Sequence, residues 1–389
     1  MDNRISVCFP AVFDRARYIT MLKALGGELC RGYGIAYPLG HKYTDEPVDR
    51  MWLTRIPTKV HRFVIPLASL FFGWPQYYRL LYYYRTFDLM VAERVANDAS
   101  RIVFTTTLLP RTIEACKKAG KTVVVEAGNS EPEMEHARIM GEYRQFGIKN
   151  MHIYGDSRFQ ASKATHFRMV DRIICISNVS MQTYLDAGIA EEMITMIPLT
   201  GCSWPVEGES SNIGKEKAFI TTAFHSFIKG THRLLLAWRE ACISDIPLIV
   251  VGEICEDMRE FIDRYGPFDN VIFTGLLSQQ QTRDLWHRYN ACGVLLSLAE
   301  GAVRVIPEMM SYGFPMLVSQ DATCDLVKNG VNGYIVEPTD TSAIADRLRW
   351  FAEDWSRVES MYNAVKRSVR KRTMEDYATE VADYLIGLL

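Results

Sequence analysis

The chain has 389 residues, a hydrophobic content of 48% and a charged content of 23%, as expected for a soluble globular protein with more than one domain. Its formal net charge of −2 gives no bulk electrostatic drive toward nucleic acid, and no segment is apolar for long enough to span a membrane. The nine cysteines are scattered and include no C-x-x-C pair, so neither disulfides nor a zinc site is expected.

Short β-rich runs alternate with helical patterns along most of the chain. In the first half, the predicted strands are Arg4–Phe9, Leu89–Ala92, Arg101–Thr106, Thr122–Glu126 and Arg172–Ser177. In the second half, they are Phe219–Ala223, Leu248–Gly252, Val271–Thr274, Cys292–Leu298 and Pro315–Ser319. Because strands that alternate with helices usually form parallel sheets, the pattern predicts the α/β class with two Rossmann-like, doubly wound domains.

A stretch rich in Gly, Ser and Glu, residues 201–215, separates the two halves and is typical of a linker. We therefore predict a first domain over 1–203 and a second domain over 204–370, facing each other across a cleft. Residues 371–389 are predicted to form a C-terminal helix, a candidate for packing back on the first domain. The basic run at 365–373 is interpreted as a solvated helical face.

Two glutamates, Glu300 and Glu308, are eight positions apart and form the most informative feature of the sequence. They follow the apolar run Cys292–Leu298, Gly301 interrupts the pattern, and Pro307 is typical of the first turn of a helix. The order is therefore strand, loop, helix N-terminus, which in a parallel sheet is where ligands bind. A helix N-terminus suits a phosphate, and the carboxylates suit the hydroxyls of a sugar.

These motifs resemble those of the retaining glycosyltransferases of family 4, which have the GT-B fold. The two glutamates have the E-x7-E spacing of that family. Four further segments resemble its E-A-M-A-x-G-x-P-V-V, G-x-x-G-x-L-V and K-G elements and the end of its first domain: 308–318, 329–338, 227–230 and 171–177.

The resemblance implies a role for three side chains. Glu300 would contact hydroxyls of the donor sugar, Glu308 would bind the ribose of the nucleotide, and Lys229 would neutralise the donor diphosphate. A lysine beside a helix N-terminus can stabilise a departing diphosphate without a metal ion, and the chain holds no Asp-x-Asp pair. The resemblance implies a UDP- or GDP-sugar as the substrate, and neither a metal nor a cofactor is expected.

The nucleotide side of the expected site departs from the family pattern. The family usually has an arginine about five residues before its lysine, but here the segment 223–227 contains none. We predict that His225 donates a hydrogen bond there, or that Arg304 supplies the missing charge, although Arg304 could instead be a first-turn arginine that pairs with Glu308. Leu276 follows a predicted strand and is a candidate for the wall of the base pocket, with a plain turn as the alternative.

Two other positions also differ from the family. The loop that often reads Gly-Phe-Gly is Gly301-Ala302-Val303 here, which keeps the backbone N–H groups but alters the shape of the pocket. Many members carry a histidine after the fourth strand of the first domain. In this chain Glu126 or Asn129 would have to take that place, and both could equally be ordinary polar residues at a strand end.

The span from Arg50 to Phe87 contains no Asp or Glu and suggests a membrane face. Cations with aromatic anchors are typical of an interfacial membrane patch, and the alternative is a helix pair that packs into the core. A nucleic-acid surface is not expected. The cations are Arg50, Arg55, Lys59, Arg62, Arg79 and Arg85, and the aromatic residues include Trp52, Phe63, Phe71, Phe72, Trp74, Tyr77, Tyr78, Tyr82, Tyr83 and Tyr84.

The sequence therefore predicts a retaining, metal-independent glycosyltransferase that moves a hexosyl group from a nucleotide sugar to a glycan or lipid-linked acceptor. The N-terminus has no signal-peptide pattern, so a cytoplasmic protein, with peripheral attachment to the inner face of a membrane, is expected. Two alternatives stay open: a sugar-nucleotide epimerase or phosphorylase on the same fold, and a non-catalytic scaffold in polysaccharide assembly.

Overall fold

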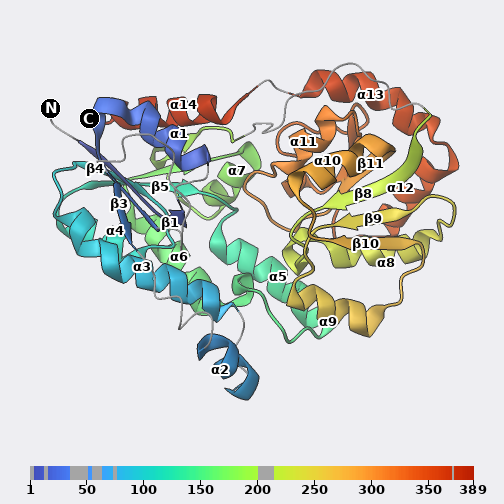
Figure 1. The fold of residues 1–389 in the computed structure, drawn as a ribbon, viewed down its shortest axis with the longest axis horizontal. Coiled ribbons are helices and arrows are strands. Elements are labelled where there is room, and N and C mark those ends of the chain that lie inside the picture. Colours follow the sequence, from blue (N-terminus) through green and yellow to red (C-terminus); the bar gives the residue numbers. More distant parts are fainter. Residues whose placement is uncertain are drawn as a thin grey trace.

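The computed structural model describes residues 4–12, 16–35, 51–54, 64–72, 77–199, 214–369 and 372–389. Within these ranges the strands form two parallel sheets, each covered by helices (Figure 1). The first sheet has the strand order β3-β2-β1-β4-β5-β6-β7 and the second β10-β9-β8-β11-β12-β13. The predicted α/β class with two doubly wound sheets is therefore confirmed.

The strands of the first sheet are β1 (Ile5–Val12), β2 (Leu29–Ile35), β3 (Met51–Thr54), β4 (Ile102–Thr105), β5 (Thr122–Ala127), β6 (Arg172–Cys175) and β7 (Ile194–Met196). Those of the second are β8 (Glu216–Thr222), β9 (Leu248–Val251), β10 (Val271–Gly275), β11 (Tyr289–Leu295), β12 (Met316–Val318) and β13 (Gly333–Ile335). All four residues of β4 and all seven of β11 are buried, because helices cover both faces of a parallel sheet.

The helices before the second sheet are α1 (Ala16–Leu25), α2 (Ile65–Phe72), α3 (Tyr78–Ala96), α4 (Pro110–Lys118), α5 (Pro132–Phe146), α6 (Ser157–Met169) and α7 (Asn178–Asp186). Those that follow are α8 (Thr231–Ala241), α9 (Glu256–Tyr265), α10 (Gln279–Arg288), α11 (Val305–Ser311), α12 (Thr341–Glu353), α13 (Ser356–Ser368) and α14 (Met374–Gly387).

One predicted strand is wrong. The run Leu89–Ala92 lies inside the 19-residue helix α3. The buried residues of that helix, which include Phe87, Val91 and Val95, recur every four positions and therefore follow the helical period. Four apolar residues in a row could not distinguish a strand from the middle of a longer helix.

Helix α5 connects the two domains. Its first turn follows β5 of the first sheet, but Ile139, Tyr143 and Phe146 are part of the hydrophobic core of the second domain. The carboxylate of Glu142 accepts a 2.7 Å hydrogen bond from His232 Nε2 on α8, and α5 is further held there by contacts to Arg233. The later half of α5 is therefore fixed to the second domain.

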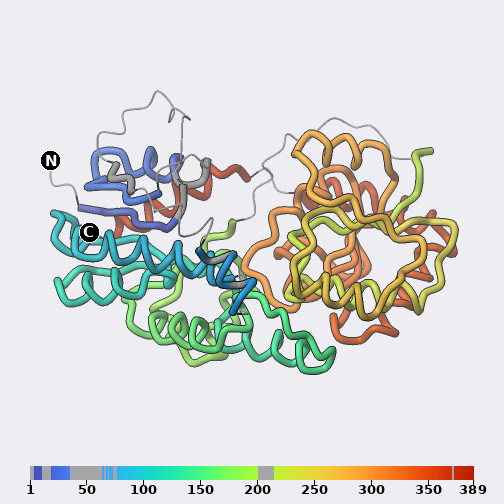
Figure 2. The backbone as a smooth tube through the Cα atoms, turned by 60° about the horizontal axis from the view of Figure 1, so that its bottom comes forward, coloured from blue at the N-terminus to red at the C-terminus, as the bar shows by residue number. Residues whose placement is uncertain are grey.

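Helix α14 connects the domains in the opposite direction, because it follows the second domain in the sequence but packs on the first. It packs against α1, and Tyr377, Val381 and Leu385 lie in a core cluster with residues of the first sheet. Figure 2 shows this C-terminal helix in red beside the blue N-terminal elements. The predicted boundary at 203/204 falls outside the described residues and stays a prediction, as does most of the linker at 201–215.

Candidate functional site

A cavity of about 530 Å³ lies at the carboxyl ends of β8, β9, β10 and β11. We call it the second-domain cavity. In a parallel sheet this is the edge at which ligands bind. It is lined by Thr222, Ala223, Phe224, Lys229, Val251, Gly252, Glu253, Leu276, Leu277, Gln279, Thr282, Trp286, Leu295, Glu300, Ala302, Val303, Arg304, Val305 and Glu308.

Both predicted glutamates face this cavity. Glu300 is only 6% exposed, and its Oε1 accepts hydrogen bonds from Lys229 Nζ at 2.5 Å and from Ser297 Oγ at 2.7 Å. Glu308 lies in the first turn of α11 and is half-buried. The structure therefore brings Glu300, Glu308 and Lys229 together, although Lys229 is 71 positions from Glu300.

The position of Lys229 depends on the glycine that follows it. Gly230 has a φ of +67°, and a Cβ there would lie 1.8 Å from the carbonyl oxygen of Leu296. Because only glycine fits such a close approach, the chain can turn from the short 3-10 helix Phe227–Lys229 into α8 directly beside the end of β11. That turn holds Lys229 opposite Glu300.

Four other predicted residues also line the second-domain cavity: Ala302, Val303, Arg304 and Leu276. Arg304 is exposed, and its guanidinium makes no hydrogen bond or ion pair with any residue that the structure describes. Leu276, in the turn after β10, is 79% exposed. The arginine is therefore available to an anion in the cavity, and the leucine offers apolar surface at its edge.

His225 lies within the wall rather than on the lining. Its ring is fully buried, with Nδ1 2.9 Å from Thr231 Oγ1 and Nε2 3.0 Å from the carbonyl oxygen of Val251. Burial lowers the pKa of His225 to about 4, so the ring is neutral at pH 7. Both nitrogens have protein partners, so the structure does not bring this histidine to the cavity as predicted.

Gly301 faces the first domain. A Cβ at this position would lie 2.1 Å from the carbonyl oxygen of Gly128. The carbonyl oxygen of Gly301 accepts a hydrogen bond from Ser177 Oγ, and that of Glu300 accepts one from Ser130 Oγ at 2.9 Å. The loop that carries Glu300 is therefore fastened to the first domain through two successive carbonyl groups, those of Glu300 and Gly301.

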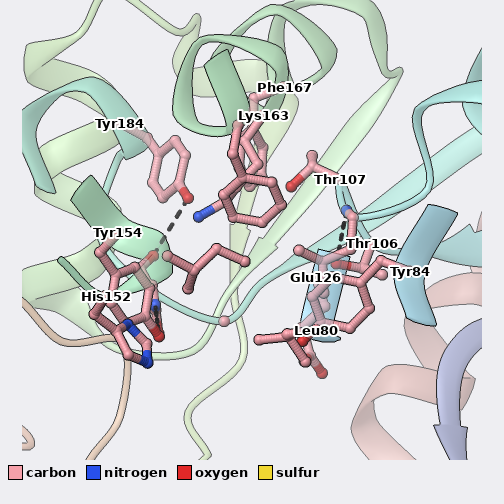
Figure 3. Close-up of a pocket in the computed structure, with 15 residues that line it drawn as sticks. Leu80, Tyr84, Thr106, Thr107, Glu126, His152, Tyr154, Lys163, Phe167 and Tyr184 are labelled. Carbon is pink, nitrogen blue, oxygen red and sulfur yellow. Dashed lines mark hydrogen bonds between the residues drawn. The ribbon is translucent and has the colours of Figure 1, made fainter. Parts of the chain in front are cut away.

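A second pocket, of about 200 Å³, lies at the carboxyl ends of β4 and β5 (Figure 3). We call it the first-domain pocket. It contains Glu126 and Asn129, the two residues predicted for this domain. The lining residues are Leu80, Tyr84, Thr106, Thr107, Leu108, Glu126, Gly128, Asn129, His152, Ile153, Tyr154, Phe159, Lys163, Phe167 and Tyr184.

Both predicted residues of the first-domain pocket are held by neighbours. Tyr377 of α14 donates a 2.5 Å hydrogen bond to Glu126 Oε2. The amide of Asn129 donates to Glu135 Oε1 at 3.0 Å and lies 3.3 Å from the hydroxyl of Tyr154. The C-terminal helix thus determines the orientation of a carboxylate 251 positions away.

The two cavities lie within electrostatic reach of each other. Burial, together with the ammonium group of Lys229, lowers the pKa of His152 to about 4. The ring of His152 lies 4.8 Å from that of Tyr154 and 6.4 Å from that of Phe224, centroid to centroid. An aromatic row therefore runs from the first-domain pocket to the second-domain cavity.

Four residues of these two cavities are not predicted from the sequence: Lys163, His152, Tyr154 and Phe224. For Lys163 a signal was available, because Phe159, Lys163 and Phe167 recur every four residues on α6 and both aromatic residues are apolar. That spacing places the lysine on the apolar face of the helix. Among the described residues, no group of three or more His, Cys, Asp or Glu side chains could hold a metal ion.

Comparison with known proteins identifies the fold. Residues 207–369 match the family model described as Glycosyl transferases group 1, which covers the second domain. No curated protein matches the chain. Among solved structures, HepE from Anabaena in complex with UDP and glucose matches with a TM-score of 0.65 at 15% identity, over 99% of this chain and 100% of that one.

Two further structures match over the same extent. Sucrose-phosphate synthase from Thermosynechococcus elongatus has a TM-score of 0.64 at 15% identity and covers 99% of each chain. The lipopolysaccharide outer core galactosyltransferase WaaB has a TM-score of 0.59 at 15% identity, over 99% of this chain and 100% of that one. The protein therefore has the GT-B fold of these glycosyltransferases, and residues 207–369 resemble the group 1 glycosyltransferase domain.

Proposed function

We propose that the protein is a retaining glycosyltransferase that moves a hexosyl group from a nucleotide sugar to a glycan or lipid-linked acceptor. The observation that carries the proposal is the convergence of Glu300, Glu308 and Lys229 on one cavity within the segment that matches the group 1 family model. Several structural relatives are described as complexes with UDP, UDP-glucose, or UDP and GlcNAc, which supports UDP over GDP as the carrier. The retaining stereochemistry rests on the family resemblance.

The cavity has a suitable group for each part of a nucleotide sugar. The carboxylate of Glu308 would accept hydrogen bonds from the ribose hydroxyls, and that of Glu300 from hydroxyls of the transferred sugar. Lys229 and Arg304 would contact the diphosphate. When the bond from the anomeric carbon to the diphosphate breaks, the electron pair leaves with the diphosphate, and these two cations would stabilise the added charge without a metal.

The acceptor would enter from the first-domain pocket, which lies across the Glu300 loop from the donor. Its hydroxyl oxygen would bond to the anomeric carbon, and its proton would pass to a diphosphate oxygen on the same face. Ser130 and Ser177 hold the Glu300 loop against the first domain, which favours exclusion of water as a competing acceptor.

We further propose that α2 contacts a membrane surface, which would bring a lipid-linked acceptor to the pocket. This helix extends from the body of the first domain (Figure 1), and Leu67, Leu70, Phe71 and Phe72 on it are 54 to 77% exposed. Exposed apolar and aromatic side chains on one helix favour an interfacial site. Arg50, Arg55, Lys59, Arg62, Phe63 and Trp74, and the side chain of Trp52, lie outside the described part.

None of the described helices is both long and apolar enough to span a bilayer. Contact through α2 would therefore be at the surface, and its test is flotation with anionic liposomes at low salt. The wild-type protein should float, and Phe71→Ser/Phe72→Ser should not. Absence of binding by the wild-type protein at low salt would contradict the membrane proposal and leave the donor proposal intact.

The donor proposal is tested by thermal-shift measurements with UDP-, GDP- and ADP-sugars. A nucleotide that binds only the folded protein raises its stability by mass action, by about 2.7 kcal/mol at 100 times the dissociation constant. UDP-sugars should raise the melting temperature of the wild-type protein, and Glu308→Gln should reduce the effect. If no nucleotide sugar shifts the melting temperature or is hydrolysed, the proposed function is wrong.

A further inference from the structure

Lys163 is a buried cation that has few partners in the protein. Its side chain lies in the first-domain pocket, and the residue is 8% exposed. Within the described residues, its Nζ forms one long ion pair and hydrogen bond, 3.5 Å to Glu135 Oε2, and lies 5.6 Å from the centroid of the Phe159 ring. An ammonium group has three donors, and burying it without close acceptors is costly. A ligand that supplies acceptors would remove that cost.

Glu135 does not depend on this lysine for its own hydrogen bonds. Its Oε1 accepts from Asn129 Nδ2 at 3.0 Å, and its Oε2 accepts from Gln160 Nε2 at 2.8 Å. The fully buried carboxylate therefore has two shorter bonds to amide groups. Lys163 can turn its remaining donors toward the pocket, where Figure 3 shows its ammonium group among the lining side chains.

The charges on the pocket lining are unevenly placed. Among the described residues that line the pocket, Lys163 carries the only ammonium or guanidinium group, and His152 is neutral at pH 7 because its pKa is about 4. Figure 3 shows Glu126 on a different side of the pocket, near Thr106 and Tyr84. Tyr377, from outside the pocket lining, donates a hydrogen bond to one of its oxygens. The one ammonium group on the described lining, which is ion-paired at 3.5 Å with Glu135 behind it, and the carboxylate of Glu126 therefore lie at different ends of the pocket.

We propose that the first-domain pocket binds one ring of an acceptor sugar that carries an anionic group, a carboxylate or a phosphate, and that Lys163 binds this group. This inference rests on the proposed function, because it names the acceptor of that reaction. The volume of about 200 Å³ is below the range typical of drug-sized ligands, so one ring enters at a time. Glu126 repels an anion at the opposite end and accepts from a hydroxyl, which fixes the orientation of the ring.

The unpartnered Nδ1 of His152 is a second point of contact in the same pocket. This buried atom has no hydrogen-bond partner among the described residues, and its ring is on the pocket lining. A neutral imidazole nitrogen can exchange a hydrogen bond with a sugar hydroxyl in either direction. The ring would also lie between the acceptor sugar and the donor side, next to Phe224.

The test compares three ligands that share the same hexose ring by saturation-transfer NMR in the presence of UDP: glucuronate, glucose 6-phosphate and glucose. For the wild-type protein we expect at least one anionic sugar to bind about tenfold more tightly than glucose, and the preference should shrink at high salt. Lys163→Gln should remove the preference without weakening glucose, and Lys163→Arg should keep part of it. The two anionic ligands distinguish a carboxylate from a phosphate.

Glucose binding as tightly as both anionic sugars in the wild-type protein would overturn the proposal, whether or not the variants fold. The same conclusion follows if Lys163→Gln folds and keeps the preference. The fold of the variant is checked by its thermal shift with UDP. If the proposed function itself is wrong, the wild-type protein should bind neither UDP nor a UDP-sugar, whatever its preference among monosaccharides. The two failures can therefore be distinguished.

Discussion

The second-domain cavity and the first-domain pocket differ in how their charged groups are held. In the larger cavity, Lys229 and Glu300 pair with each other, and Arg304 has no partner among the described residues. In the smaller pocket, Glu126 is held by Tyr377 of a distant helix, and Lys163 has one long contact. The family model matches only the domain with the first arrangement. The second-domain cavity therefore lies within the segment that matches the family model, whereas the charged groups of the first-domain pocket are held by contacts from distant parts of the chain.

The largest effect should come from Glu300→Gln. Glutamine keeps the shape of the side chain but removes the charge that pairs with Lys229 and weakens the bonds to the donor sugar. We expect the transfer rate, measured as UDP release in the presence of acceptor, to fall by about 100-fold or more. Ser297→Ala is the matched control and should cost only a few-fold. A loss below about tenfold for Glu300→Gln would contradict its assigned role.

Lys229→Met should lower kcat by about 100-fold, because the departing diphosphate loses its nearest cation. Since Lys229 and Glu300 contact each other, the double variant with Glu300→Gln should lose much less than the product of the single effects. Rates for the wild-type protein and the three variants under the same conditions measure this coupling. Full additivity would show that the pair does not act as a unit.

Arg304→Ala should raise the Michaelis constant for the donor by about tenfold with a smaller effect on kcat, because a charge-assisted contact to the diphosphate is lost. An unchanged constant would refute the role of Arg304. Phe224 stands five residues before Lys229 and lines the same cavity. Adding Phe224→Arg to Arg304→Ala should therefore recover part of the donor affinity.

Tyr377→Phe acts on the other half of the site. It removes the hydrogen bond to Glu126, so kcat/KM for the acceptor should fall by about threefold to tenfold while the Michaelis constant for the donor stays the same. Kinetics with each substrate varied in turn separate the two effects. A change in the Michaelis constant for the donor would mean that α14 affects both cavities and that the two regions do not act separately.

The smallest change concerns the two buried histidines. NMR signals of His152 and His225 should stay constant from pH 7.5 to 5.5 and titrate near pH 4, well below the ordinary value of 6.5. Because the unfolded chain takes up protons at a higher pH, stability should fall as the pH drops from about 6.5 toward 4, by about 2 kcal/mol at pH 5 for His225 alone. Ordinary titration of His225 near 6.5 would contradict its burial.

The sequence predicted the parts of this molecule that depend on local pattern. Buried strands, a glycine at a close approach and the spacing of Glu300 and Glu308 all leave signals within a few residues. The pairs Tyr377–Glu126 and Ser130–Glu300 leave none, because they join segments separated by 251 and 170 positions. Their partners are fixed by the docking of helices and domains, which a residue pattern does not encode.

Predictions from local sequence patterns were wrong where one pattern is compatible with two different structures. The apolar run Leu89–Ala92 was compatible with a strand, and a helix of 19 residues contains it. His225 stands near the expected diphosphate position, but its ring turns inward to Thr231 and Val251. The direction of a side chain at a strand end depends on tertiary packing, which explains why the structure was needed to exclude His225 from the lining.

The bridging role of α5 limits how this protein can be recombined with others. Ile139, Tyr143 and Phe146 belong to one core while the helix is encoded with the opposite half of the chain. In a chimera joined near residue 204, the α5 helix of another protein would have to pack into a second-domain core that is complementary to these three side chains. A chimera that keeps this second domain would therefore also need to keep α5, although α5 precedes the junction in the sequence.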